Sequence, residues 1–210
     1  SRDVIAAGDD GVVLQSRDGG TTWETRPSGT GAALRAVSFL GDGKTGVIVG
    51  GDDRRWRVAE VILRTTDAGT TWSTMAAPER IRLYGVTATQ SATGGGFTAV
   101  GDTGIVLRSK DAGRTWSREK SSAPPGWLSS VASPDGRTLT AVGANGLVKR
   151  SEDGGGSWTS QRQGPTLFAT SPVAASPTTL VVPHLSGLLR SVDGGKTFAS
   201  ATLPEKTRGL

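Results

Sequence analysis

One stretch of the chain places a hydroxyl, a carboxylate, a glycine, a second hydroxyl and an indole within eight residues. It reads SKDAGRTW and runs from Ser109 to Trp116. A carboxylate beside hydroxyl groups could serve acid–base catalysis, and a glycine-containing turn could bind a phosphate through its backbone amides. Whether the same pattern recurs elsewhere in the chain decides between such chemistry and a structural role.

The same pattern occurs five times, always as Ser/Thr-x-Asp-x-Gly-x-Ser/Thr-aromatic. The five aspartates follow one another at intervals of 40 to 49 residues and are Asp18, Asp67, Asp111, Asp153 and Asp193. A period of this length is typical of a repeat architecture. Because a catalytic carboxylate is needed once or as a pair, five equivalents predict a structural role and no catalytic residue.

The spacing within each copy suits a tight turn between two strands. The carboxylate can accept hydrogen bonds from turn amides, the glycine can take a positive φ, and the first hydroxyl can close the loop. The aromatic residue then enters the next strand. We therefore expect it to be buried in all five copies, as Trp23, Trp72, Trp116, Trp158 and Phe198.

Composition limits the remaining possibilities. The 210 residues include 31 Gly, 10 Pro and no Cys, and the formal net charge is +5. Without cysteine there is no disulfide or thiolate metal site, and we predict no metal and no cofactor. No helix-turn-helix, zinc-finger spacing or basic run with stacking aromatics is present, so no nucleic-acid partner is predicted. No long apolar run and no signal-like start are present, which predicts a processed or trimmed soluble chain.

Short β-branched runs fill each period between Gly-Asp turns. One period reads LYGVTA, then GFTAVGDTG, then IVLRS, followed by the box and a fourth short strand. We label these strands A, B, C and D, with the box between C and D, and we expect little helix. Four antiparallel strands repeated every forty-odd residues predict an all-β fold, a β-propeller of four-stranded blades.

The chain begins in strand B of its first blade, and its last residues, EKTRGL, could supply the missing strand A. We therefore predict a single propeller domain over residues 1–210, with the C-terminal strand pairing with the N-terminal blade to close the ring. Five blades are favoured. The alternative is a fragment of a six- or seven-bladed propeller.

The repeated string resembles the Asp-box, also called the bacterial neuraminidase repeat, over essentially the whole chain. Passages such as VGDTGIVLRSKDAGRTW and VGANGLVKRSEDGGGSW are most similar to the photosystem II stability/assembly factor-like family. This resemblance implies a non-enzymatic propeller that binds other proteins during the assembly of membrane complexes. It also implies an extracytoplasmic location, periplasmic or secreted, and no insertion into the membrane.

The alternative function is a carbohydrate-active propeller, sialidase-like or another glycoside hydrolase or glycan binder. A sialidase needs a Tyr nucleophile, a Glu, an acid/base Asp and three Arg that grip the substrate carboxylate. The single tyrosine, Tyr84, stands at the expected start of a strand A, where a packed aromatic is the simpler interpretation. Xyloglucanases of this repeat class use two propellers, for which the chain is too short.

A basic residue precedes four of the five boxes, as Arg64, Arg108, Arg150 and Arg190, with Gln15 in the remaining place. Because these residues repeat, we expect them to bond turn carbonyls of a neighbouring blade. A ring of exposed arginines is the alternative.

Function in a repeat protein is expected where the repeat is broken. The clearest break is the B-to-C loop within GGDDRRWRVAE, which carries Arg54, Arg55, Trp56 and Arg57. We predict a partner-binding surface centred on these residues, on the face opposite the boxes. The D-to-A loops of that face add Arg80, Arg82 and Trp127, which would suit an acidic, partly apolar protein segment. The nearby acidic residues could instead neutralise the arginines in a solvated loop.

Overall fold

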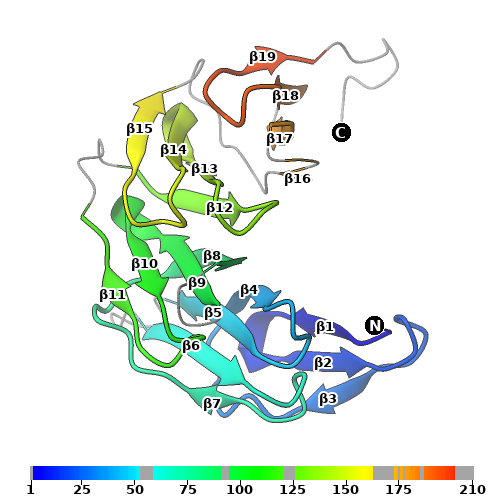
Figure 1. Ribbon diagram of the computed structural model, residues 1–210. Helices are drawn as coiled ribbons and strands as arrows, with labels where there is room; N and C mark the ends of the chain where they lie inside the picture. Colours follow the sequence, from blue (N-terminus) through cyan, green and yellow to red (C-terminus); the bar gives the residue numbers. More distant parts are fainter. Residues whose placement is uncertain are drawn as a thin grey trace. The chain divides into compact units, whose positions relative to one another are not determined.

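The computed structural model describes residues 2–52, 59–90, 95–120, 126–162, 173–174, 176, 178–184 and 187–201. Their strands form five sheets, which follow one another along the chain from blue to orange in Figure 1. The first sheet has three strands and each of the others has four. Strands in every sheet are adjacent in chain order, as expected for blades of a propeller.

The first sheet contains β1 (Val4–Ala7), β2 (Val13–Ser16) and β3 (Glu24–Arg26). The second sheet contains β4 (Leu34–Phe39), β5 (Gly46–Asp52), β6 (Ala59–Thr65) and β7 (Ser73–Thr74). The third sheet contains β8 (Leu83–Thr89), β9 (Gly96–Gly101), β10 (Val106–Ser109) and β11 (Ser117–Arg118). The fourth sheet contains β12 (Leu128–Ala132), β13 (Leu139–Gly143), β14 (Leu147–Ser151) and β15 (Thr159–Arg162). The fifth contains β16 (Val173–Ala174), β17 (Leu180–His184), β18 (Gly187–Ser191) and β19 (Ala199–Ser200).

This order confirms the four-strand period and the place of the box. In each four-stranded sheet the strands correspond to A, B, C and D, and the box connects C to D. The first sheet begins with strand B, as predicted. The ring closure itself stays a prediction, because residues 202–210 lie outside the described residues.

Helix is scarce among the described residues, which confirms the expectation from the strand pattern. The helical segments there are three 3-10 turns, η1 (Asp9–Gly11), η3 (Asp102–Gly104) and η4 (Ala144–Gly146). Each turn links a strand B to a strand C. No helix in this part of the chain is long and apolar enough to cross a membrane.

The chain divides into two units, Ser1–Ala99 with Leu107–Arg118, and Val100–Val106 with Glu119–Leu210. Within each unit, apolar side chains of consecutive sheets pack against one another. In the first unit Val13 and Leu34 pack with Ile48 and Leu63. In the second unit Val142 and Val148 pack with Val182 of the next sheet. All residues of β9 and β13 are buried, because inner strands are covered on both faces.

A glycine near the end of strand B allows strand A of the same sheet to approach closely. A Cβ at Gly143 would lie 1.9 Å from the carbonyl oxygen of Trp127, and one at Gly50 would lie 2.1 Å from that of Ala33. The same carbonyls accept hydrogen bonds from Ala144 N at 3.0 Å and Gly51 N at 2.9 Å. In the second and fourth sheets the glycine of the Val-Gly pair therefore allows a close backbone contact for which a larger side chain has no room.

Gly143→Ala should destabilise the protein by about 3 kcal/mol, because the contact is with backbone that cannot rotate away. The free energy of unfolding in urea measures this loss. Gly31→Ala is the matched control, since nothing lies within 4 Å of a Cβ there. We expect the control to change stability by no more than about 0.5 kcal/mol, and equal losses in both variants would contradict the assignment.

Candidate functional site

The box from Ser109 to Trp116 is a closed network of hydrogen bonds around one carboxylate. Ser109 Oγ donates to Asp111 Oδ1 at 2.8 Å and accepts a hydrogen bond from Gly113 N at 2.8 Å. Thr115 donates to both oxygens of Asp111, from its amide at 2.9 Å and from its hydroxyl at 2.6 Å. Gly113 has a φ of 82° and its carbonyl accepts a hydrogen bond from Trp116 Nε1 at 3.3 Å. Each side chain of the motif is thus used within the turn.

The other four boxes repeat this network. The bonds from the first hydroxyl to the carboxylate are 2.7–2.8 Å long and originate at Ser16, Thr65, Ser151 and Ser191. The hydroxyls that donate to the second carboxylate oxygen belong to Thr22, Thr71, Ser157 and Thr197. In all five boxes the aspartate therefore accepts hydrogen bonds from its own turn, and its structural role stays a prediction.

These bonds also set the acidity of the carboxylates. Partial burial alone would raise the pKa of Asp111, but hydrogen bonds from Thr115 and Ser109 outweigh it and lower the pKa to about 2. The pKa of Asp153 is lowered to about 2 in the same way, by Ser157 and Ser151. A carboxylate of such low basicity, with both oxygens engaged, is a poor general base or nucleophile.

The aromatic residues of the boxes are less uniformly buried than we predicted. Trp116 is 8% exposed, and Trp72, Trp158 and Phe198 are half-buried. Trp23 is 42% exposed, which contradicts the expectation for the first copy. The reason lies in its surroundings, since Trp72 packs against the apolar cluster shared by the first two sheets whereas Trp23 belongs to the three-stranded first sheet.

The residue before the box connects consecutive sheets, as we predicted. Arg64 Nε donates to the carbonyl oxygen of Ala112 at 2.7 Å, and Arg150 Nε donates to that of Gly194 at 2.6 Å. Gln15 makes the equivalent bond, from Nε2 to the carbonyl oxygen of Ala68 at 2.9 Å. In each case the acceptor is a backbone carbonyl in the box of the next sheet. The interpretation as structural contacts is therefore confirmed for Arg64 and Arg150, and Gln15 makes the same kind of contact.

The predicted partner-binding residues fall in three segments. Arg54, Arg55, Trp56 and Arg57 lie outside the described residues, between β5 and β6. Arg80 is exposed and Arg82 half-buried in the segment that precedes β8, in the first unit. Trp127 is 38% exposed in the segment that precedes β12, in the second unit. The three segments are the predicted B-to-C and D-to-A connections, but their joint surface stays a prediction.

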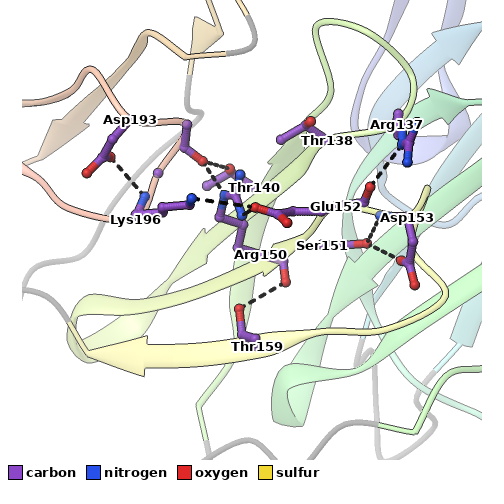
Figure 2. Close-up of polar contacts among 12 residues, drawn as sticks. Arg137, Thr138, Thr140, Arg150, Ser151, Glu152, Asp153, Thr159, Asp193 and Lys196 are labelled. Carbon is purple, nitrogen blue, oxygen red and sulfur yellow. Dashed lines mark hydrogen bonds and ion pairs between the residues drawn. The ribbon is translucent and has the colours of Figure 1, made fainter.

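Sequence reasoning missed a hollow of about 320 Å³ beside the fourth and fifth boxes. It is lined by Arg150, Glu152, Ser157, Thr159, Gln161 and Lys196. Figure 2 shows Arg150, Glu152 and Lys196 converging from the two sheets. One sequence signal could have found it, because Glu152 is the only acidic residue at the second position of a box.

Other chemistry is sparse in the described part of the chain. No group of three or more His, Asp or Glu side chains that could hold a metal ion is present there. Tyr84 is the second residue of β8 and half-buried, which agrees with its predicted place in strand A.

Comparisons with known proteins agree with this geometry. A family model described as photosynthesis system II assembly factor YCF48 matches residues 3–119 and, in a second match, residues 58–194. The structure of YCF48 from Cyanidioschyzon merolae is 21% identical, has a TM-score of 0.68, and is matched over 99% of this chain and 70% of its own. A structure of YCF48 bound to D1 peptide is 20% identical with a TM-score of 0.46, over 94% and 76% of the two chains. No curated protein sequence matches the chain.

The GH74 enzyme of Niastella koreensis is also similar in structure. Its TM-score is 0.77 at 16% identity, and the match covers 99% of this chain but 36% of the enzyme. The chain thus spans about a third of that enzyme's length. At such identities the solved structures show a shared fold, which confirms the predicted β-propeller.

Asp111→Ala should lower the free energy of unfolding by about 1–3 kcal/mol, because it leaves the amide and hydroxyl of Thr115 and the hydroxyl of Ser109 without their acceptor. Urea unfolding measures the loss. Lys120→Ala, an exposed change outside the box, is the control. Loss of partner binding at unchanged stability would show that the carboxylate has a functional role instead.

Stability should also fall in acid. The pKa values of Asp18, Asp67 and Asp193 are lowered as well, by hydrogen bonds within their turns that outweigh any burial. In each case the pKa of the carboxylate in the folded protein lies below its value of about 4 in the unfolded chain. As the pH falls, the unfolded state therefore binds protons before the folded state does. The contribution of these carboxylates to the free energy of unfolding is thus present above about pH 4 and is lost towards pH 2. The thermal midpoint should drop over this interval, and less steeply in Asp111→Ala. A constant midpoint from pH 5 to pH 2.5 would contradict the linkage.

Proposed function

Because the chain belongs to the photosynthesis system II assembly factor YCF48 family, we propose that it is a non-enzymatic propeller that binds protein partners during the assembly of membrane-associated or exported complexes. The observation that carries the proposal is the family match, which together spans residues 3–194. The geometry of the boxes supports it, since the repeated carboxylates and hydroxyls bond one another within their turns.

The partner surface is proposed around Arg54, Arg55, Trp56 and Arg57. The hairpin that leads to these residues is long, because β5 and β6 pair at seven positions from Gly46 with Thr65 to Asp52 with Ala59. The corresponding strands of the fourth sheet pair at four positions and are joined by the short turn η4. An extended loop can add a binding function without disturbing the sheet that carries it.

The partner is proposed to be an acidic, partly apolar segment of a membrane-complex subunit. Arginine binds carboxylates through forked hydrogen bonds and tryptophan contributes a large buried area, so both dominate interface energies. Among the described residues, Arg118 Nη1 donates to both carboxylate oxygens of Glu79, an acid between the box and β8, at 2.8 and 2.9 Å. Arg80, Arg82 and Trp127 would complete the surface if their loops share the face of the Arg54–Arg57 loop.

The family resemblance also supports an extracytoplasmic location, periplasmic or secreted. We propose it on that ground alone. The same propeller fold occurs in the GH74 enzymes, and the test of function must therefore include turnover of glycosides.

The triple change Arg54→Ala, Trp56→Ala, Arg57→Ala should leave the fold intact and reduce capture of the membrane-complex partner at least tenfold, which corresponds to about 1.4 kcal/mol. Affinity capture from native membranes, followed by titration of the recovered subunit, measures the effect. The double change Arg17→Ala, Arg114→Ala is the control, because it removes the same positive charge from box loops. Equal capture by the triple variant and the unchanged protein would refute the surface.

The protein should show no glycosidase activity, and Tyr84→Phe should leave partner capture unchanged. A panel of aryl glycosides, xyloglucan and sialosides measures turnover. Release of a sugar or an aryl leaving group, without any recovered protein partner, would replace the proposed function by the carbohydrate-active alternative.

A further inference from the structure

The hollow beside the fourth and fifth boxes lies where the repeat is broken in a second place. The second position of the box carries Arg17, Thr66, Lys110, Glu152 and Val192 in the five copies. Glu152 therefore places a carboxylate where no other copy has one. It stands two residues after Arg150, whose guanidinium group crosses to the fifth sheet.

Arg150 is held in a fixed orientation. Its side chain is only 14% exposed, and Nε donates to the carbonyl oxygen of Gly194 at 2.6 Å. Its Nη1 donates to Glu152 Oε1. The guanidinium group is thus anchored at one edge and presents the other edge to a carboxylate.

Glu152 and Lys196 occupy the outer part of the hollow. Their side chains are 61% and 62% exposed, and Lys196 Nζ lies 3.9 Å from Glu152 Oε1. Glu152 Oε1 thus contacts both Arg150 and Lys196, and Figure 2 draws these three side chains close together. The backbone of Glu152 is held separately, because its carbonyl oxygen accepts a hydrogen bond from Arg137 Nε at 3.2 Å. Its side chain can therefore turn into solvent without moving the box.

The rest of the lining is neutral and polar. Ser157 Oγ donates to Asp153, and Thr159 Oγ1 donates to the carbonyl oxygen of Arg150 at 3.3 Å. Gln161 Nε2 donates to the carbonyl oxygens of Gly195 and Lys196 at 3.1 and 2.9 Å. These bonds fix the walls around the two cations. The hollow is thus open to solvent on the side of Glu152 and Lys196, with Arg150 as its one largely buried cation.

The first sheet offers a useful contrast. There the neutral Gln15 replaces the arginine, and its Oε1 accepts a hydrogen bond from Arg26 Nε at 2.7 Å. Arg26 is paired with Glu24 on the same strand. Arg26 and Glu24 thus neutralise each other on one strand, and the residue before this box, Gln15, carries no charge.

We propose that this hollow is a carboxylate-binding subsite and that Glu152 is its internal occupant. A carboxylate of a protein partner, from an acidic side chain or a C-terminus, replaces Glu152 on Arg150 and Lys196, and Glu152 turns into solvent. The exchange leaves no buried charge unpaired, because one carboxylate takes the place of another. Removing the charge of Glu152 should therefore strengthen binding. This inference is separate from the surface around Arg54 and does not depend on it.

The test is fluorescence anisotropy with two labelled peptides at constant salt. One is a hexaglutamate with an amidated C-terminus, and the other is a neutral peptide with a free C-terminal carboxylate. Glu152→Gln should bind at least one of them at least fivefold more tightly than the unchanged protein, and the peptide that gains identifies the source of the carboxylate. Lys196→Met in the Glu152→Gln background should remove most of the gain.

Glu24→Gln is the matched control, because it removes a paired and exposed carboxylate and changes the net charge by the same amount. We expect it to leave both affinities unchanged. Equal affinities of Glu152→Gln and the unchanged protein, absence of binding by both, or an equal gain in Glu24→Gln would overturn the proposal. Capture of the membrane-complex partner is scored separately with the Arg54, Trp56 and Arg57 variant, so failure of one assignment is distinguishable from failure of the other.

Discussion

The structure depends on one carboxylate in each repeat whose oxygens are saturated by donors of its own turn. In the third copy, Asp111 accepts bonds from Ser109 and from the amide and hydroxyl of Thr115. A single hydrogen bond contributes only about 1 kcal/mol, but an orphaned buried donor costs more. The network therefore fixes the path between the third and fourth strands. It also fixes where the aromatic residue and the fourth strand of the same sheet begin.

A second constraint joins consecutive sheets within each unit. The side chain before the box donates to a backbone carbonyl in the following box, from Gln15, Arg64 and Arg150. Apolar contacts between sheets supply the bulk of the packing, but they are not directional. The bonds to box carbonyls add direction, because an acceptor at one defined position sets how far one sheet is shifted along its neighbour.

Because these contacts repeat, the proposed binding functions fall at positions that differ between copies. The carboxylates and hydroxyls of the boxes are already bonded and weakly basic, as the pKa of about 2 at Asp111 shows. The long β5–β6 hairpin and the side chain of Glu152 depart from the repeat, and neither is needed to close a turn. A repeat protein can change such positions without weakening its stack.

The sequence by itself determined the period, the order of strands, the chemistry of the box and the kind of acceptor that Arg64 and Arg150 find. These are local properties, since each follows from residues within one repeat and the next. It did not determine that Trp23 is 42% exposed, because burial depends on what packs over a residue. Nor did it place Lys196 beside Arg150 and Glu152, more than forty residues earlier. Only the stacking of the fifth sheet on the fourth decided that, because it brings side chains of separate repeats into one hollow.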